Sequence, residues 1–282
     1  MSYILFDIGG TKTRVAVSDD LKKFFPPVKF KTPATGKELV AMMADEVKKM
    51  TDKDIRAIAG GIRGILDHDK TMMVHDPGGP LKAYEEQPLA QMLKKKFSAE
   101  VYLENDTAMV GLGEAIFGAG KGYDIVAYHT VSTGVGGVRI VNGDIDAFAT
   151  GFEPGHQILD VDHTILGNSK EATLENLVSG SALEERAGMK PYDIPQGDAV
   201  WGQLAEYLGY GLRNTILYWS PNVIVLGGSM IVGDPRIKLN DIITYTHSTM
   251  GDTAPIPDII DADLGDFGGL YGAMAKLSIN QQ

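Results

Sequence analysis

The sequence predicts a layered α/β fold built from two similar halves. Each half begins with a short apolar run, a glycine turn and a second apolar run, with the turns at residues 9–12 and 133–137. After each hairpin, strand-like apolar segments alternate with segments in which apolar residues recur at helical spacing. Such alternation is typical of an α/β domain. The repeated hairpin indicates a structural duplication.

The first half is expected to open with hairpin strands at 3–8 and 12–18 and to continue with a helix at 36–50. In that helix, apolar residues recur every three or four positions. The remaining elements expected in this half are a strand at 55–59, a glycine-bearing loop at 60–64, a helix at about 87–97, a strand at 101–103 and a helix from 106 to 116.

The second half is expected to repeat the plan with hairpin strands at 125–131 and 138–141. A long helix at 198–219 carries apolar residues at helical spacing. The remaining elements expected in this half are a strand at 223–226, a strand at 257–260 and a final helix at 268–279.

The composition excludes several classes of function. The 282 residues include 26 Lys and Arg against 37 Asp and Glu, a net charge of −11, which disfavours nonspecific binding of nucleic acid. The chain has no cysteine, so disulfides, thiol catalysis and cysteine-bound zinc are excluded. No stretch reads as a signal peptide or a membrane span, and we expect a cytoplasmic protein without a membrane partner.

The two glycine turns are candidate phosphate-binding loops. Glycine allows positive φ and bares the backbone N–H groups, and Thr11, Lys12 and Thr133 would add donors. A Gly-Gly pair is also a common hairpin turn, so either turn alone is explained equally well as structure. The presence of two such turns favours a polyphosphate, and hence a nucleotide.

A second candidate feature is the run Leu103-Glu104-Asn105-Asp106, where a strand ends and a helix begins. Asn and Asp are preferred helix caps, which explains the run structurally. Ligands also bind at the carboxyl ends of strands in α/β sheets, where an aspartate can accept a proton from a hydroxyl. We expect the helix N-terminus to keep Asp106 ionised at neutral pH.

Glu153, His156 and Glu175 are candidate sugar-binding residues. Taken singly, charged residues of this kind are usually solvated loop or helix-face residues. Together with an aspartate base, they could bind the several hydroxyl groups of a sugar.

Six segments, in order along the chain, resemble the ROK family (repressor, open reading frame, kinase) of the sugar-kinase/actin-like ATPase superfamily. They are the runs at 7–12, 104–106, 132–137, 153–156, 174–180 and 221–228. The resemblance implies a two-domain actin-like ATPase fold, related to ribonuclease H, with a duplicated sheet and an interdomain cleft. A small N-terminal domain would comprise 1–112 plus 266–282, and a larger domain 113–265.

The resemblance also implies ATP-dependent phosphorylation of a hexose, at its 6-OH, with Mg²⁺. Asp106 would be the general base, and Asp7 would orient the Mg²⁺ through water. The sugar would be bound by Asn105, Glu153, His156, Glu175 and Gly64. The nucleotide would be bound by Gly9, Gly10, Thr11, Lys12, Thr133, Gly134, Gly136, Gly227 and Gly228. Dimers are usual among such proteins, so a homodimer is expected.

The chain departs from the family pattern in three places. Members commonly carry a cysteine-rich zinc motif in the interval that corresponds to 157–173, which has no cysteine here, so no structural zinc is expected. Asp160, Asp162 and His163 could bind a metal with His156, although a metal-free loop is the simpler expectation. Arg63 replaces the usual proline of a Gly-x-Pro-Gly loop, and 74–79 lacks the typical asparagine-containing pattern.

Those loops help to frame the sugar, so the acceptor stays open. An N-acetylhexosamine (GlcNAc or ManNAc) kinase or a fructokinase of the same family is an alternative. A sugar-sensing regulator is a second, but such proteins carry a helix-turn-helix segment before the first phosphate loop, and Asp7 lies close to the start. A different actin-like ATPase, such as an acyl-phosphate kinase or a chaperone-type hydrolase, is disfavoured by the Glu153–His156 and Asn105-Asp106 motifs.

Overall fold

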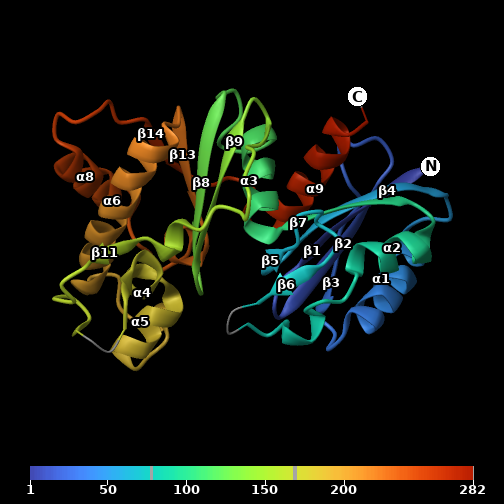
Figure 1. The fold of residues 1–282 in the computed structure, drawn as a ribbon, viewed down its shortest axis with the longest axis horizontal. Helices are drawn as coiled ribbons and strands as arrows, with labels where there is room; N and C mark the ends of the chain where they lie inside the picture. Colours follow the sequence, from blue (N-terminus) through green and yellow to red (C-terminus); the bar gives the residue numbers. More distant parts are fainter. Residues whose placement is uncertain (77–78, 168–169, 282) are drawn as a thin grey trace. The chain divides into compact units, whose positions relative to one another are not determined.

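The computed structural model describes residues 1–76, 79–167 and 170–281. The chain divides into two compact units (Figure 1). Unit 1 comprises Met1–Phe117, Ala147–Gly151 and Asp266–Gln282, and unit 2 comprises Gly118–Asp146 and Phe152–Gly265.

The centre of unit 1 is a five-stranded sheet in the order β3-β2-β1-β4-β7. β1 pairs antiparallel with β2 and parallel with β4, which in turn pairs parallel with β7. The strands of this sheet are β1 (Ser2–Ile8), β2 (Lys12–Ser18), β3 (Val28–Lys31), β4 (Ile55–Ile62) and β7 (Glu100–Asn105). A small two-stranded sheet adds β5 (Ile65–Leu66) and β6 (Met73–His75).

Helices cover both faces of this sheet, because β1 is apolar on both sides. Ile4 and Phe6 pack in one core with α1 (Gly36–Met50) and α2 (Leu89–Phe97). Tyr3 and Leu5, which alternate with them, pack in another with α3 (Asp106–Ile116) and α9 (Gly268–Ile279). β1 and β4, which pair in parallel, therefore have few charged side chains, as expected for parallel strands buried on both faces.

Local sequence signals set the helix ends in unit 1. Thr35 caps α1 in a capping box with Glu38, each side chain accepting from the other's backbone N–H group. The Asn105 side chain caps α3 by accepting a hydrogen bond from the Ala108 N–H group at 3.1 Å. This cap fixes the start of α3 at Asp106.

Unit 2 repeats the sheet of unit 1, in the order β10-β9-β8-β13-β14. Again the first pairs are antiparallel and the last two are parallel. The strands are β8 (Ile125–Val131), β9 (Val135–Val141), β10 (Asp144–Ile145), β13 (Val223–Gly227) and β14 (Asp258–Asp261). This topology confirms the duplicated α/β fold predicted from the two hairpins.

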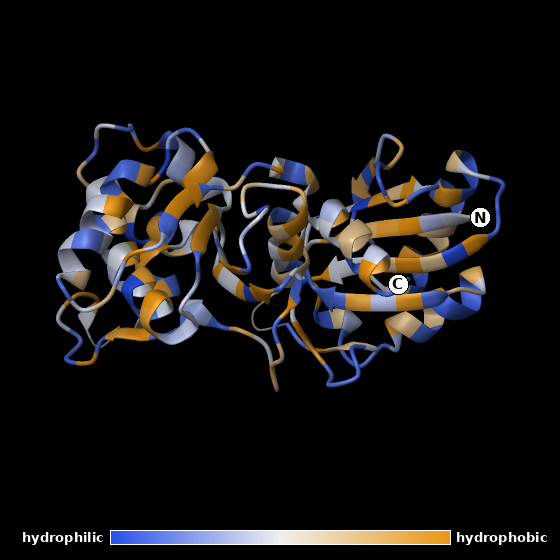
Figure 2. Cartoon of the chain, turned by 90° about the horizontal axis from the view of Figure 1, so that it is seen from above, coloured by the Kyte–Doolittle hydropathy of each residue, from blue (hydrophilic) through white to orange (hydrophobic). Residues whose placement is uncertain are grey.

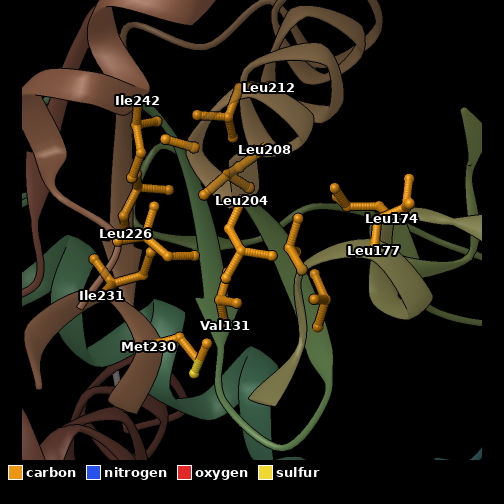
Figure 3. Close-up of a cluster of buried hydrophobic side chains, with 14 of the residues drawn as sticks. Val131, Leu174, Leu177, Leu204, Leu208, Leu212, Leu226, Met230, Ile231 and Ile242 are labelled. Carbon is orange, nitrogen blue, oxygen red and sulfur yellow. The ribbon is translucent and has the colours of Figure 1, made fainter. Parts of the chain in front are cut away.

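The core of unit 2 lies between this sheet and its helices. Leu204, Leu208 and Leu212 of α6 (Val200–Trp219) pack toward Val131 and Leu226 of the sheet (Figure 3). The other elements are β11 (Ile158–Asp160), β12 (Ala172–Thr173), α4 (Leu174–Val178), α5 (Gly180–Ala187), α7 (Ser229–Val232) and α8 (Leu239–Met250). Short 3-10 turns lie at Lys82–Tyr84, Pro154–His156, Pro191–Asp193 and Gly265–Phe267. In both units, the strands are coloured largely as hydrophobic in Figure 2.

The strand β4 is longer than the sequence predicts. β4 continues through Gly60 and Gly61, which the pattern places in a loop. These glycines stay in the strand because other parts of the chain approach them closely: a Cβ atom on Gly61 would lie 2.8 Å from the Asp106 Cα atom.

In the described part of the chain, no helix combines the length and hydropathy needed to cross a bilayer.

Candidate active site

In unit 1, three parallel strands end side by side at one edge of the sheet. Ile8 pairs with Ile62, and Ile62 pairs with Asn105. The residues next to these positions are Asp7, Arg63 and Asp106, which the register brings to the same carboxyl edge. This edge is where ligands bind in α/β sheets.

The first glycine turn, between β1 and β2, has free backbone donors. The Gly9 N–H group donates to the Lys12 carbonyl at 3.0 Å, whereas those of Gly10 and Thr11 donate to no group in the described part of the chain. Thr32 supports the turn from β3: its hydroxyl donates to the Gly9 carbonyl at 2.7 Å, and its N–H group donates to the Thr11 carbonyl. Adjacent unpaired N–H groups suit an anion such as phosphate.

Positive φ, one of the two reasons expected for the glycines of this turn, is wrong, because neither Gly9 nor Gly10 has positive φ. Gly10 is instead required by close packing, since a Cβ atom there would lie 2.3 Å from the Pro80 ring. The same correction applies to Gly134 in the second turn, where a Cβ atom would lie 2.6 Å from a Glu175 carboxylate oxygen.

Asp7 is a carboxylate in an unfavourable environment. Burial, with the negative charge of Asp106 as the second cause, raises the pKa of Asp7 to about 6. Arg14 opposes this rise by donating to Oδ2 at 3.2 Å, and the same guanidinium binds Asp266 at 2.7 Å. No hydrogen bond from the described residues reaches Oδ1. A cation beside Oδ1 would relieve the repulsion between Asp7 and Asp106.

Asp106 is the first residue of α3. Its Oδ1 accepts the Thr107 N–H group at 2.8 Å, and within the described chain Oδ2 accepts no hydrogen bond. Burial raises the pKa of Asp106, against the lowering effects of the Thr107 hydrogen bond and the positive charge of Arg63. Burial thus acts against the helix N-terminus, and the ionisation of Asp106 at neutral pH stays a prediction. A raised pKa makes a carboxylate a stronger base.

Asn105 and Gly64 are joined at the same edge. The Asn105 amide donates from Nδ2 to the Gly64 carbonyl at 3.1 Å, while its Oδ1 caps α3. Gly64 has φ of +105°, a conformation that side-chain-bearing residues rarely adopt. The capping explanation of Asn105 is therefore correct, and its contact with a sugar stays a prediction.

The next residue back, Glu104, forms a buried ion pair that the sequence did not indicate. Its Oε2 binds the Lys70 ammonium group, and its Oε1 accepts the Asn105 N–H group at 3.0 Å. The Lys70 ammonium group also lies 4.7 Å from the centre of the Phe148 ring. This ion pair therefore stabilises the end of β7 at Asn105, next to the start of α3 at Asp106.

In unit 2, the second glycine turn lies between β8 and β9 and has the same free donors. The N–H groups of Thr133 and Gly134 bind no group among the described residues, and Thr133 is exposed. Glu175, in the first turn of α4, accepts the Val135 N–H group at 2.8 Å. Glu175 is thus tied to the turn, a link that the sequence did not indicate; Gly136 follows in β9.

Glu153 and His156 lie beside this turn. Glu153 precedes the short helical turn Pro154–His156, whose last residue is His156, and about half of each side chain is exposed. The Glu153 carboxylate lies 3.9 Å from the His156 Nε2 atom. Gly155 packs against the turn, since a Cβ atom there would lie 2.3 Å from the Val135 carbonyl oxygen. The three predicted sugar residues of unit 2 are therefore gathered around one turn.

Gly227 and Gly228 close the same edge of the unit 2 sheet. Gly227 ends β13 and pairs with Thr130 of β8. Gly228 has φ of +90° and precedes α7, and a Cβ atom there would lie 2.3 Å from the Val131 carbonyl oxygen. This backbone lies at the strand ends beside the second turn, as a nucleotide-binding segment requires.

The interval that lacks cysteine is organised by Asp160. Its carboxylate accepts the Thr164 hydroxyl at 3.2 Å and the Ile165 N–H group at 2.6 Å. Within residues 1–76, 79–167 and 170–281, no three His, Cys, Asp or Glu side chains are grouped as a metal site. The alternative metal set of Asp160, Asp162, His163 and His156 is therefore not assembled in the described residues, and residues 168–169 of the interval lie outside them.

Comparison with known proteins identifies the family. A family model described as "ROK family" matches residues 3–279. A fructokinase from Streptococcus mutans is 27% identical, over 92% of this chain and 89% of its own. A glucokinase from Streptomyces coelicolor is 26% identical, over 95% of this chain and 94% of its own.

Two solved structures have the same fold. A ROK hexokinase from Thermus thermophilus superposes with a TM-score of 0.82 at 27% identity, over 100% of both chains. A ROK glucokinase from Streptomyces griseus, solved with glucose and AMPPNP, gives 0.77 at 26% identity, over 98% of this chain and 99% of its own. The fold is that of an actin-like ATPase, as predicted. The chain belongs to the ROK family.

Proposed function

We propose that this ROK protein is an ATP-dependent sugar kinase that phosphorylates a neutral hexose at its 6-OH. The observation that carries the proposal is Asp106, a desolvated carboxylate with a free oxygen at the carboxyl edge of three parallel strands. The fructokinase, glucokinase and hexokinase relatives, one of them solved with glucose and AMPPNP, support the reaction class.

Asp106 Oδ2 accepts the proton of the acceptor hydroxyl as that oxygen attacks the γ-phosphorus of ATP. The bond from the γ-phosphorus to the bridging oxygen breaks, and ADP leaves. A positioned base contributes about 10²–10⁴-fold to the rate. The rest of phosphoryl transfer depends on positioning and on stabilising charge.

The free N–H groups of both glycine turns bind phosphate oxygens of ATP. The free N–H groups are those of Gly10 and Thr11 in the first turn and of Thr133 and Gly134 in the second. Gly9 and Gly136 allow the phosphates to approach the backbone of their turns, and Lys12 acts through its ammonium group. Gly227 and Gly228 contact the adenosine. In both turns the unpaired N–H groups donate no hydrogen bond within the described part of the chain, so these groups break no internal hydrogen bond when they bind phosphate.

Mg²⁺ is the implied metal, and the donors fit it. Magnesium is usually held by one or two carboxylates together with substrate phosphates, and Asp7 offers one buried carboxylate with an unpaired oxygen. Asp7 would hold the ion through water, and the ion would neutralise charge on the phosphates. No cysteine is available for a structural zinc.

The acceptor is held by Asn105 and Gly64 in unit 1 and by Glu153, His156 and Glu175 in unit 2. Glucose is the first candidate; fructose and N-acetylated hexosamines are the alternatives. We also propose a homodimer in the cytoplasm, with no nucleic-acid or membrane partner. The net charge of −11 supports the absence of a nucleic-acid partner.

A coupled ADP-release assay tests the proposal. The protein is incubated with ATP, Mg²⁺ and each of glucose, mannose, fructose, N-acetylglucosamine and N-acetylmannosamine. We expect sugar-dependent ADP release with at least one of them, phosphate on the product's 6-oxygen by NMR, and loss of activity when Mg²⁺ is omitted. ADP release that is the same without any sugar would instead indicate a different actin-like ATPase.

A further inference from the structure

Arg63 and Asp76, the two departures from the family pattern, form an ion pair. The Arg63 Nε atom donates to Asp76 Oδ1 at 3.0 Å. Arg63 directly follows β4, whose last residue pairs with Asn105, and its own N–H group donates to the Ile8 carbonyl at 3.2 Å. The pair therefore lies at the strand edge that carries Asp7 and Asp106.

Asp76 is fixed before any ligand arrives. Its side chain is fully buried, and its Oδ2 accepts the Leu81 N–H group at 2.7 Å. Its own N–H group donates to Glu85 Oε1 at 2.9 Å. Gly79 leaves room for this carboxylate, since a Cβ atom there would lie 1.9 Å from Oδ1. Asp76 thus holds the Arg63 guanidinium through its Nε atom.

The side of the Arg63 guanidinium that carries the two terminal nitrogens is available to a ligand. Its two terminal nitrogens donate to no described residue, and 39% of the side chain is exposed. The positive charge of Arg63 also acts on Asp106, whose pKa it lowers. Arg63 therefore presents two coplanar N–H donors near the base, a geometry that suits two adjacent oxygen atoms.

The local charge decides between a neutral and an anionic acceptor. Three carboxyl groups lie at this edge, those of Asp7, Asp76 and Asp106, against the two guanidinium groups of Arg14 and Arg63. The edge is acidic before ATP binds, and Asp76 already neutralises Arg63. A carboxylate on the acceptor would be repelled, so the two oxygens are those of neighbouring hydroxyl groups.

We propose that Arg63, held by Asp76, contacts the acceptor, with its two terminal nitrogens donating hydrogen bonds to two neighbouring hydroxyl oxygens of a neutral hexose. The inference rests on the proposed kinase function. A proline at this position has no such donors, so the residue sets the acceptor preference of this chain apart from that of relatives with the usual loop.

Steady-state kinetics of four variants test this contact, with acceptor and ATP varied separately. Arg63→Gln removes the charge and the pair of coplanar N–H donors, and Arg63→Lys keeps only the charge. Asp76→Asn removes the carboxylate that holds the Arg63 guanidinium in place. We expect each to raise the acceptor KM by about 10–100-fold while the KM for ATP changes less than twofold. Arg56→Gln, an exposed arginine on the same strand, is the control and should change neither.

Monodeoxy analogues of the accepted hexose identify the hydroxyls. Removal of either of two neighbouring hydroxyl groups should raise the acceptor KM of the wild-type protein and should have little further effect on the acceptor KM of Arg63→Gln. The inference is wrong if Arg63→Gln and Arg63→Lys, folded by thermal melting, keep the wild-type acceptor KM, or if a hexuronic acid is a better acceptor than its hexose. Those results leave the kinase activity of the wild type intact, whereas a wild type that phosphorylates no hexose overturns the proposed function as well.

Discussion

Asp7 shows how a functional residue is maintained at a cost to stability. Its pKa of about 6 lies well above the usual value of 3.8, chiefly because the carboxyl group is buried, and Arg14 offsets only part of that effect. Ionisation of Asp7 is therefore less favourable in the folded protein than in the unfolded chain, so above pH 6 the charged carboxylate lowers the stability of the fold. Residues under such strain are common at active sites.

Replacing Asp7 by Asn should stabilise the fold and abolish activity. The pKa difference corresponds to about 3 kcal/mol at most, so we expect Asp7→Asn to gain about 1–3 kcal/mol of unfolding free energy at pH 8. The gain should fall below about 1 kcal/mol near pH 4, where the Asp7 carboxyl is protonated in the folded state and about half protonated in the unfolded chain. Urea unfolding at the two pH values measures this. A loss of stability at pH 8 would show that the Arg14 contact outweighs burial.

At this scale the sequence predicted residue types better than their contacts. Asp106 and Asn105 were found because they follow a short strand and precede a helical pattern. The Arg63–Asp76 and Lys70–Glu104 pairs were not, because each joins residues whose proximity depends on tertiary structure. The signals that remained in the sequence were Arg63 in place of proline and the unusual run after Val74.

In the proposed function, nucleotide binding depends on the first glycine turn, and Thr32, which directly follows β3, supports that turn. Thr32 is buried, and its hydroxyl joins the Gly9 carbonyl to the Thr13 hydroxyl at 2.7 and 3.1 Å. A buried polar group that loses its partner costs about 1–3 kcal/mol. Thr32 is therefore a positioning residue for the turn.

Thr32→Val, which keeps the shape and removes the hydroxyl, should lower stability by about 1–3 kcal/mol and raise the KM for ATP several-fold. The KM for the sugar should stay within twofold. Thr246→Val is a matched control, because that buried hydroxyl also donates to a backbone carbonyl but lies in α8. If both variants change the KM for ATP equally, Thr32 has no specific role in the turn.

Elements with a strong periodic pattern were predicted well. The first helix and the last have the predicted bounds, and both hairpins occur where the glycine turns predicted them. β4 was cut short at Ala59 because Gly60 and Gly61 read as a loop. Their place in the strand depends on Phe6 of β1 and Asp106 of α3, which pack against them.

At the scale of the whole molecule, two sheets of the same topology carry two similar glycine turns. The duplication was predictable because each half opens with the same hairpin signal. The core of unit 2 contains a feature that the sequence did not indicate: His129 is fully buried on β8. Its Nε2 atom lies 3.0 Å from the Thr215 hydroxyl, and its ring stacks on Trp219.

Global stability should therefore fall in mild acid. Burial lowers the pKa of His129 to about 4, from 6.5 when unfolded, so the unfolded state binds the proton first as the pH drops through that range. Between pH 7.5 and 4.5 this should cost about 2–3 kcal/mol. His129→Gln, which does not titrate, should lose that much less over the same interval in urea unfolding. Equal losses in the two proteins would contradict the assignment.

The central claim is that Asp106 is the base of a sugar kinase, and Asp106→Asn tests it most directly. Sugar affinity by calorimetry and phosphoryl transfer by ADP release are measured on the same preparation. We predict a sugar affinity within about threefold of wild type and a kcat lowered by about 10²–10⁴-fold. A variant whose turnover stays within a few fold of the wild type would contradict the assignment of Asp106 as the base.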